Sequence, residues 1–158
     1  MKNFKRKKIT FPLVLAFTVM SIFGANVAQA QQAKLITVKS IKSFDATVEG
    51  IKKGVADAGM MVLAEINHGK ILVMTGLSIN AESIFIGNPN VGKDAFSENT
   101  AVGLAIPLRV NVYEENGVTY INYFAPSSEL GYFKGDKVKM IGKKLDEKIG
   151  MLTGMFAK

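Results

Sequence analysis

The chain has 158 residues, 48% of them hydrophobic, and contains no cysteine. Its formal net charge is +7, but five of the 20 basic residues and none of the 13 acidic residues lie within residues 1–30. The other 128 residues therefore carry a net charge of only +2, and they are enough for one domain with a hydrophobic core. This composition excludes disulfides, thiolate metal sites and thiol nucleophiles, and it gives no support to nucleic-acid binding.

Residues 1–30 have the three-part pattern of a secretory signal peptide. A basic block precedes an apolar run from Ile9 to about Gly24, and Ala28-Gln29-Ala30 has the small residues typical of a signal peptidase site. The apolar run is shorter than a bilayer-spanning helix, and no twin-arginine pair is present. We expect cleavage after Ala30, export to the periplasm or the exterior by the general secretory route, and no stable membrane insertion of the product.

The next residues predict a strand, a helix and a second strand. A tail and a first strand, Leu35 to Val38, occupy residues 31–42. A helix is then predicted from an N-cap at Ser43 to about Ala58. One face of it is apolar and consists of Phe44, Val48, Ile51 and Val55. Gly59 follows as the expected left-handed cap. The apolar run from Met60 to Ile66 predicts a central strand, whereas residues 68–75 fit either a short helix or a turn.

Further along, the pattern predicts a strand over residues 83–86, a short helix or turn over 93–97 and a last helix over about 137–155. Asn116-Gly117 is the dipeptide that most favours a type I′ hairpin, so it predicts paired strands over 109–115 and 118–124. Together these elements indicate the α+β class: a single two-layer domain with a central, mostly antiparallel sheet that includes a β-hairpin, and with helices packed on it.

The hairpin register assigns its residues to two faces. The predicted core face consists of Val110, Val112, Ile121 and Tyr123. The opposite face mixes guanidinium, amide and aromatic groups, from Arg109, Asn111, Tyr113, Tyr120, Asn122 and Phe124. Such a mixture suits a ligand-binding face or a subunit interface, with Tyr113, Tyr120 and Phe124 as its aromatic members. A solvated face with ordinary cross-strand aromatic pairs is the alternative.

His68 is the only histidine, and it follows a strand that looks buried. Its imidazole could ligate copper or haem together with a methionine, contribute to a ligand pocket, or serve a structural role. The candidate sulfur ligands are Met60, Met61, Met74, Met140, Met151 and Met155. A single histidine cannot form a histidine-rich zinc site, so we expect no metal or cofactor, with His68-based haem or copper binding as the alternative.

Two further features of the sequence bear on nucleotide binding and catalysis. Gly87 to Lys93 has the glycine and lysine spacing of a phosphate-binding loop, but Asp94 stands where a hydroxyl should bind magnesium. A structural turn is therefore the favoured interpretation. No serine lies in a nucleophile elbow, so the sequence leans away from an enzyme without excluding one.

Several short motifs occur in a recognisable order. They are Glu65-Ile66-Asn67-His68, Gly76-Leu77-Ser78, Ile84-Phe85-Ile86-Gly87-Asn88-Pro89 and Leu104-Ala105-Ile106-Pro107-Leu108-Arg109-Val110, completed by Tyr113, Gly117 and Pro126. On these residues the chain resembles the exported branch of the domain-of-unknown-function 302 family over about residues 43–130, with the final helix region, 131–158, outside the pattern.

The resemblance implies a compact α+β domain that forms homodimers and has no established activity. It also matches the Asn-His pair at Asn67-His68 and the Gly-Asn-Pro turn at residues 87–89. Other members have cysteine where this chain has Gly87, so a thiol-based role does not transfer.

The sequence thus favours a non-enzymatic module that binds a small molecule. The candidate ligand residues are Asn67, His68, Asn88, Pro89 and Arg109, and we expect His68 to approach the Asn88-Pro89 turn past the sheet. One alternative is a haem or copper carrier that uses His68 and a methionine. Another is a structural homodimer formed through the hairpin face or the last helix, where Gly150 and Gly154 would permit close approach.

Overall fold

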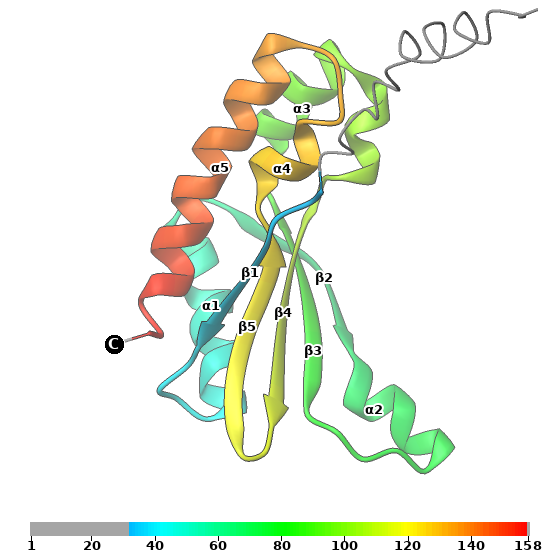
Figure 1. Cartoon of the computed structure of the whole chain (residues 1–158), viewed down its shortest axis with the longest axis vertical. Coiled ribbons are helices and arrows are strands. Elements are labelled where there is room, and N and C mark those ends of the chain that lie inside the picture. Colours follow the sequence, from blue (N-terminus) through cyan, green and yellow to red (C-terminus); the bar gives the residue numbers. More distant parts are fainter. Residues whose placement is uncertain (1–31, 158) are drawn as a thin grey trace, which may run out of the picture. The chain divides into compact units, whose positions relative to one another are not determined.

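The computed structural model describes residues 32–157, which form an antiparallel five-stranded sheet with helices packed on it (Figure 1). The strands are β1 (Leu35–Lys39), β2 (Met61–Asn67), β3 (Ala81–Gly87), β4 (Leu108–Glu115) and β5 (Val118–Phe124), in the spatial order β1-β5-β4-β3-β2. The α-helices are α1 (Phe44–Asp57), α2 (His68–Leu72), α3 (Pro89–Glu98), α4 (Pro126–Leu130) and α5 (Asp136–Gly154). The predicted α+β fold is confirmed. The predicted signal segment and its cleavage site after Ala30 lie outside the described residues.

Alternation along the strands separates the two faces of the sheet. One face is buried beneath α1 and α5; from β4 it receives Leu108, Val110 and Val112, and it joins the core that includes Ile51 and Ile149 of these helices. Full burial of each such aliphatic side chain contributes about 1.5–3 kcal/mol. The opposite face, here called the uncovered face, is formed by Ser83, Phe85, Arg109, Asn111, Tyr113, Tyr120, Asn122 and Phe124.

The β4–β5 hairpin has the predicted register. Asn116 and Gly117 both have positive φ, 53° and 75°, as a type I′ turn requires. Glu115 therefore pairs with Val118, and Tyr113 lies opposite Tyr120 with their ring centroids 5.4 Å apart. The local turn chemistry alone is enough to fix which side chains share a face.

The predicted first helix is confirmed as α1, with one difference at its start. Ser43 occupies the N-cap position, but its side chain makes no capping hydrogen bond. Gly59 has the expected left-handed conformation, with φ of 67°. Gly54 permits the close approach of α5, because a Cβ there would lie only 2.5 Å from Leu152 Cδ1.

Residues 68–80 form an arm between β2 and β3 that begins with α2 and continues as a 3-10 helix at Val73–Thr75. The structure thus selects the helical alternative for residues 68–75. Figure 1 shows α2 projecting to the side of the sheet from the end of β2. The arm exposes a row of large apolar side chains: Ile71, Val73, Met74, Leu77 and Ile79.

Three elements differ from the sequence-based expectation. Strand β2 was predicted to be a central strand, but it lies at the edge of the sheet. Helix α3 begins at Pro89 and is longer than the predicted residues 93–97, and α4 was not anticipated. Within residues 32–157, no helix combines the length and apolar character needed to cross a membrane.

Candidate functional site

A row of hydrogen-bonding side chains crosses the uncovered face and is here called the polar row. It consists of His68, Ser83, Asn111 and Asn122, contributed by α2, β3, β4 and β5. His68 Nε2 lies 2.9 Å from Ser83 Oγ, and Ser83 Oγ donates to Asn111 Oδ1 over 3.4 Å. Asn111 Nδ2 in turn donates to Asn122 Oδ1 over 3.0 Å. The strands bring these groups together because Ser83 pairs with Asn111 and Asn111 pairs with Asn122.

The hydrogen bond between His68 Nε2 and Ser83 Oγ runs in the direction that the tautomer of the ring sets, because an imidazole nitrogen can donate or accept. In nucleophilic catalysis the histidine accepts the serine proton, and a third group orients the histidine. The pair alone therefore assigns no catalytic role to Ser83.

A hollow of about 390 Å³ lies beside the polar row. Ser83, Asn111 and Asn122 line it together with Phe124, and charged side chains enter from Arg109 of β4 and Glu129 of α4. The hollow thus combines one cation, one carboxyl group, several amide or hydroxyl groups and an aromatic ring. We call it the polar hollow.

Burial raises the pKa of Glu129, and the nearby positive charge of Arg109 offsets only part of that increase. The folded protein therefore retains this proton to a higher pH than the unfolded chain does. Farther along the uncovered face, burial also raises the pKa of Tyr113, with smaller contributions from Glu115 and Tyr120. This phenol remains neutral at physiological pH.

The raised pKa of Glu129 determines whether this group makes the protein more or less stable as the pH rises. We expect the free energy of unfolding to fall as pH rises from the ordinary glutamate value of 4.5 through the raised folded value, because the folded state binds the proton more strongly. Glu129→Gln should lack this component, whereas Glu147→Gln on exposed α5 should retain it. Urea unfolding measured across this pH range checks the prediction, and a profile for Glu129→Gln parallel to that of the unmodified protein would contradict it.

The structure corrects the expected convergence of His68 with the Asn88-Pro89 turn. Strands β2 and β3 are antiparallel, so Asn67 pairs with Glu82 at one end and Met61 pairs with Gly87 at the other. His68 and Asn88 therefore lie at opposite ends of β3. The two sets of candidate residues belong to different sites.

Asn67 and Asn88 both cap helices. Asn67 Oδ1 accepts from the backbone N–H of Lys70 over 2.8 Å, and its Nδ2 donates to buried Glu82. Asn88 Oδ1 accepts from the N–H groups of Asn90 and Val91, and its Nδ2 donates to the carbonyl of Gly59 over 2.8 Å. Pro89 occupies the first turn of α3, where its missing N–H costs nothing. The segment considered as a phosphate loop thus forms a strand end, a cap and a helical turn.

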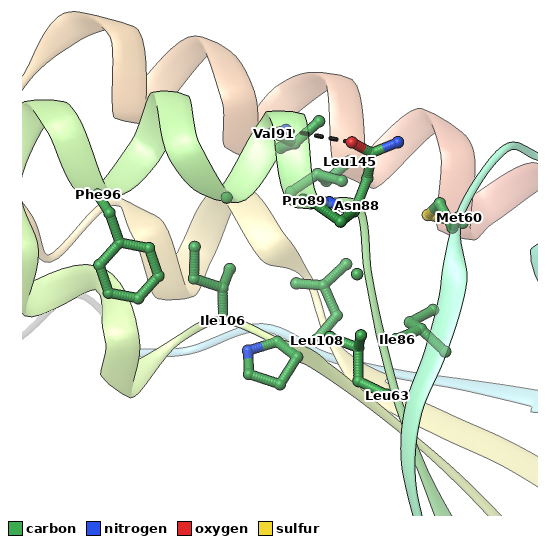
Figure 2. Close-up of a pocket in the computed structure, with 13 residues that line it drawn as sticks. Met60, Leu63, Ile86, Asn88, Pro89, Val91, Phe96, Ile106, Leu108 and Leu145 are labelled. Carbon is green, nitrogen blue, oxygen red and sulfur yellow. Dashed lines mark hydrogen bonds between the residues drawn. The ribbon is translucent and has the colours of Figure 1, made fainter.

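A second hollow, here called the α3 pocket, lies between α3 and the sheet (Figure 2). Its volume is about 220 Å³, and its apolar lining includes Met60, Leu63, Ile86, Phe96, Ile106 and Leu108. Asn88 and Pro89 border it, whereas the candidates on the uncovered face do not. The sequence analysis missed this pocket because four distant segments form it, the last of them α5 with Leu145. It also missed Glu129, because α4 was not predicted.

No group of three or more His, Asp or Glu side chains within residues 32–157 is arranged to hold a metal ion. His68 Nε2 lies 2.9 Å from Ser83 Oγ on the uncovered face, whereas α5, which carries the candidate ligands Met140 and Met151, packs on the other face.

The fold and this site together define a two-layer α+β domain with a polar, uncovered sheet face. The chain belongs to the family described as Domain of unknown function DUF302, whose model matches residues 36–154. The match is wider than residues 43–130, where the recognisable motifs lie, because it includes most of β1 and all of α5.

A solved structure and several curated relatives are similar to this chain. The crystal structure of an uncharacterized conserved DUF302 protein from Bacillus stearothermophilus aligns with a TM-score of 0.72 and 22% identity, covering 77% of this chain and 97% of that one. A fluoride-specific ion channel, FluC 1, of Brucella suis is 30% identical over 82 residues, which are 51% of this chain and 32% of the relative. FluC 2 of Brucella melitensis matches with 30% identity over 82 residues. The chain thus spans about a third of these curated relatives.

Proposed function

We propose that this domain is a non-enzymatic binding module that holds a small carboxylate-bearing molecule on its uncovered face. The observation that carries the proposal is the convergence of Arg109, Phe124 and three members of the polar row on one hollow of about 390 Å³. Small-molecule sites commonly have volumes of roughly 300–1,000 Å³. The polar hollow therefore has an appropriate size and a small set of converging polar groups.

The chemistry of the lining residues supports a carboxylate as the anchoring group. A guanidinium matches a carboxylate with two parallel charge-assisted hydrogen bonds, and Arg109 is the cation of the polar hollow. Asn111 and Asn122 offer amide groups for further polar atoms of the ligand, and Phe124 can cover an apolar part.

The test is a calorimetric titration of the protein with succinate, glutamate and N-acetylglycine. We expect at least one of these carboxylates to bind, and Arg109→Gln to weaken that binding by about tenfold or more, the equivalent of one charge-assisted hydrogen bond. Lys143→Gln removes an exposed cation from α5 and should leave the affinity unchanged. Equal affinities for the unmodified protein and Arg109→Gln, or no binding of any of the three, would refute the proposal.

A second candidate function is self-association, favoured by a different surface. Strand β2 lies at the edge of the sheet, and its side chains Met61, Leu63 and Ile66 are exposed. The apolar arm follows this strand at its Ile66 end. An unprotected edge can pair with the same edge of a second copy across a twofold axis, which would extend the sheet and bury both arms. We propose that the occupant of this surface is a second copy of the chain.

Sedimentation analysis of two matched variants tests this arrangement. Met74 on the arm is 86% exposed, and Met151 on α5 is 69% exposed. We expect Met74→Lys to weaken dimerisation by about tenfold or more, because it places a charge in an apolar interface, and Met151→Lys to have no effect. A monomer at high protein concentration would rule the arrangement out. Loss of the dimer in Met151→Lys but not in Met74→Lys would show that α5 forms the interface instead.

A further inference from the structure

The apolar lining of the α3 pocket limits the kind of ligand that can bind there. Its one polar side chain, Asn88, has both ends of its amide engaged, with the N–H groups of Asn90 and Val91 and with the carbonyl of Gly59. A ligand that entered would therefore find no unsatisfied side-chain partner. Apolar cavities of about 150 Å³ remain dry and bind hydrocarbons, and this pocket is larger, at about 220 Å³.

The mouth of the pocket leaves apolar side chains in contact with water. Leu63 is 52% exposed and Phe96 is 42% exposed, although both line the pocket. Figure 2 shows Phe96 on α3 and Leu63 on β2 on either side of Ile106 and Leu108. A hydrocarbon bound between these side chains would remove their apolar surface from water, which is the main source of affinity in such sites.

A smaller hollow of about 160 Å³ adjoins the α3 pocket and has a different charge. The two share the walls formed by Met60, Val91 and Leu145. Lys144 and Lys148 of α5 border the smaller hollow, and Asp94 on its rim is paired with Lys137 over 2.9 Å. The charge next to the apolar pocket is therefore positive.

We infer that the α3 pocket binds the alkyl chain of an amphiphile whose anionic head group lies toward Lys144 and Lys148. The chain length is limited by the pocket volume, which suits a medium-length chain better than a membrane lipid. The site is separate from the polar hollow, because the two share no lining residue and because Leu108 lies on the buried face of β4 and Arg109 on the uncovered face. The inference therefore does not depend on the proposed carboxylate site.

Gly92 offers a way to close the pocket without disturbing the core. It lines the pocket from the same face of α3 as Pro89 and Phe96, and a Cβ built on it meets no atom within 4 Å. Gly92→Leu should therefore project into the pocket, and Gly92→Ala should fill it in part. Both replacements also favour the helix relative to glycine. Gly150→Leu is the matched control, because its Cβ likewise meets no atom within 4 Å and it lies outside the pocket.

The experiment is a calorimetric titration of the protein with decanoate and decyltrimethylammonium below their critical micelle concentrations, and with decanol below its solubility limit. We expect decanoate to bind most tightly, Gly92→Leu to weaken decanoate by about tenfold or more, Gly92→Ala to have a smaller effect in the same direction, and Gly150→Leu to bind normally. Lys144→Gln should reduce decanoate affinity to that of decanol.

Three results would overturn the inference. Undiminished decanoate binding in a folded Gly92→Leu protein, or in Gly92→Ala if the larger variant does not fold, would place the alkyl chain elsewhere. Equal affinities for the three amphiphiles would show that the site does not select an anionic head group. If decanoate did not bind to the unmodified protein, the α3 pocket would not be a site for an anionic amphiphile.

Discussion

Asn88→Ala should lower the free energy of unfolding by about 2 kcal/mol, because one side chain makes three hydrogen bonds that alanine cannot replace. The loss of a helix N-cap costs about 1 kcal/mol and up to about 2. The hydrogen bond from Nδ2 to the carbonyl of Gly59, over 2.8 Å, adds a further contribution of about 1 kcal/mol. This bond also ties the turn after α1 to the start of α3, so its loss should loosen one wall of the α3 pocket.

Two companion variants separate the contributions of Asn88. Asn88→Asp keeps the capping oxygen but places a carboxylate beside the carbonyl of Gly59, so we expect an intermediate loss of stability. Asn90→Ala removes an exposed neighbouring side chain and should change stability by less than about 0.5 kcal/mol. Urea unfolding of the three variants provides the measurement. If Asn88→Ala were as stable as Asn90→Ala, the cap would not have the structural role described here.

Two glycines of α5 should respond to alanine in opposite directions. A Cβ at Gly142 would lie 2.8 Å from the Cα of Ser127 and 3.3 Å from the carbonyl oxygen of Pro126, so α4 would have to move. Overpacking of this kind costs about 1–3 kcal/mol, and the gain in helix propensity of about 1 kcal/mol offsets only part of it. Gly142→Ala should therefore be destabilising by roughly 1–2 kcal/mol.

The same substitution at Gly150 should stabilise the protein by about 0.5–1 kcal/mol, since a Cβ there meets no atom within 4 Å. Thermal unfolding of the two variants checks the difference in sign. Gly142→Ala also has a functional consequence, because α4 carries Glu129 to the polar hollow. A Gly142→Ala protein as stable as Gly150→Ala would show that α4 does not pack as closely as described.

The parts of the fold that were predictable depend on local chemistry. Asn116-Gly117 determines a turn type, the turn type determines the strand register, and the register separates Arg109 and Asn111 from the buried valines. The uncovered face could be assigned in this way before any tertiary contact was known. The stripes of α1 and α5 were equally clear because each helix buries one continuous face.

The parts that were not predictable depend on where distant segments meet. The sequence analysis placed His68 beside Asn88, because the connection over residues 68–80 is long enough for either a parallel or an antiparallel pairing of β2 with β3. Only the antiparallel pairing places His68 near Ser83, where it is found. The α3 pocket requires residues from β2, α3 and the segment before β4, and no periodicity within one segment reveals such a contact.

The most direct test of the uncovered face as a binding site is amide chemical-shift mapping of the protein with the carboxylate that binds it. Our account predicts that the perturbed amides cluster around Ser83, Arg109, Asn111 and Asn122, with Glu129 of α4 among them. Perturbations confined to residues around Met60 and Phe96, or scattered over α5, would contradict it.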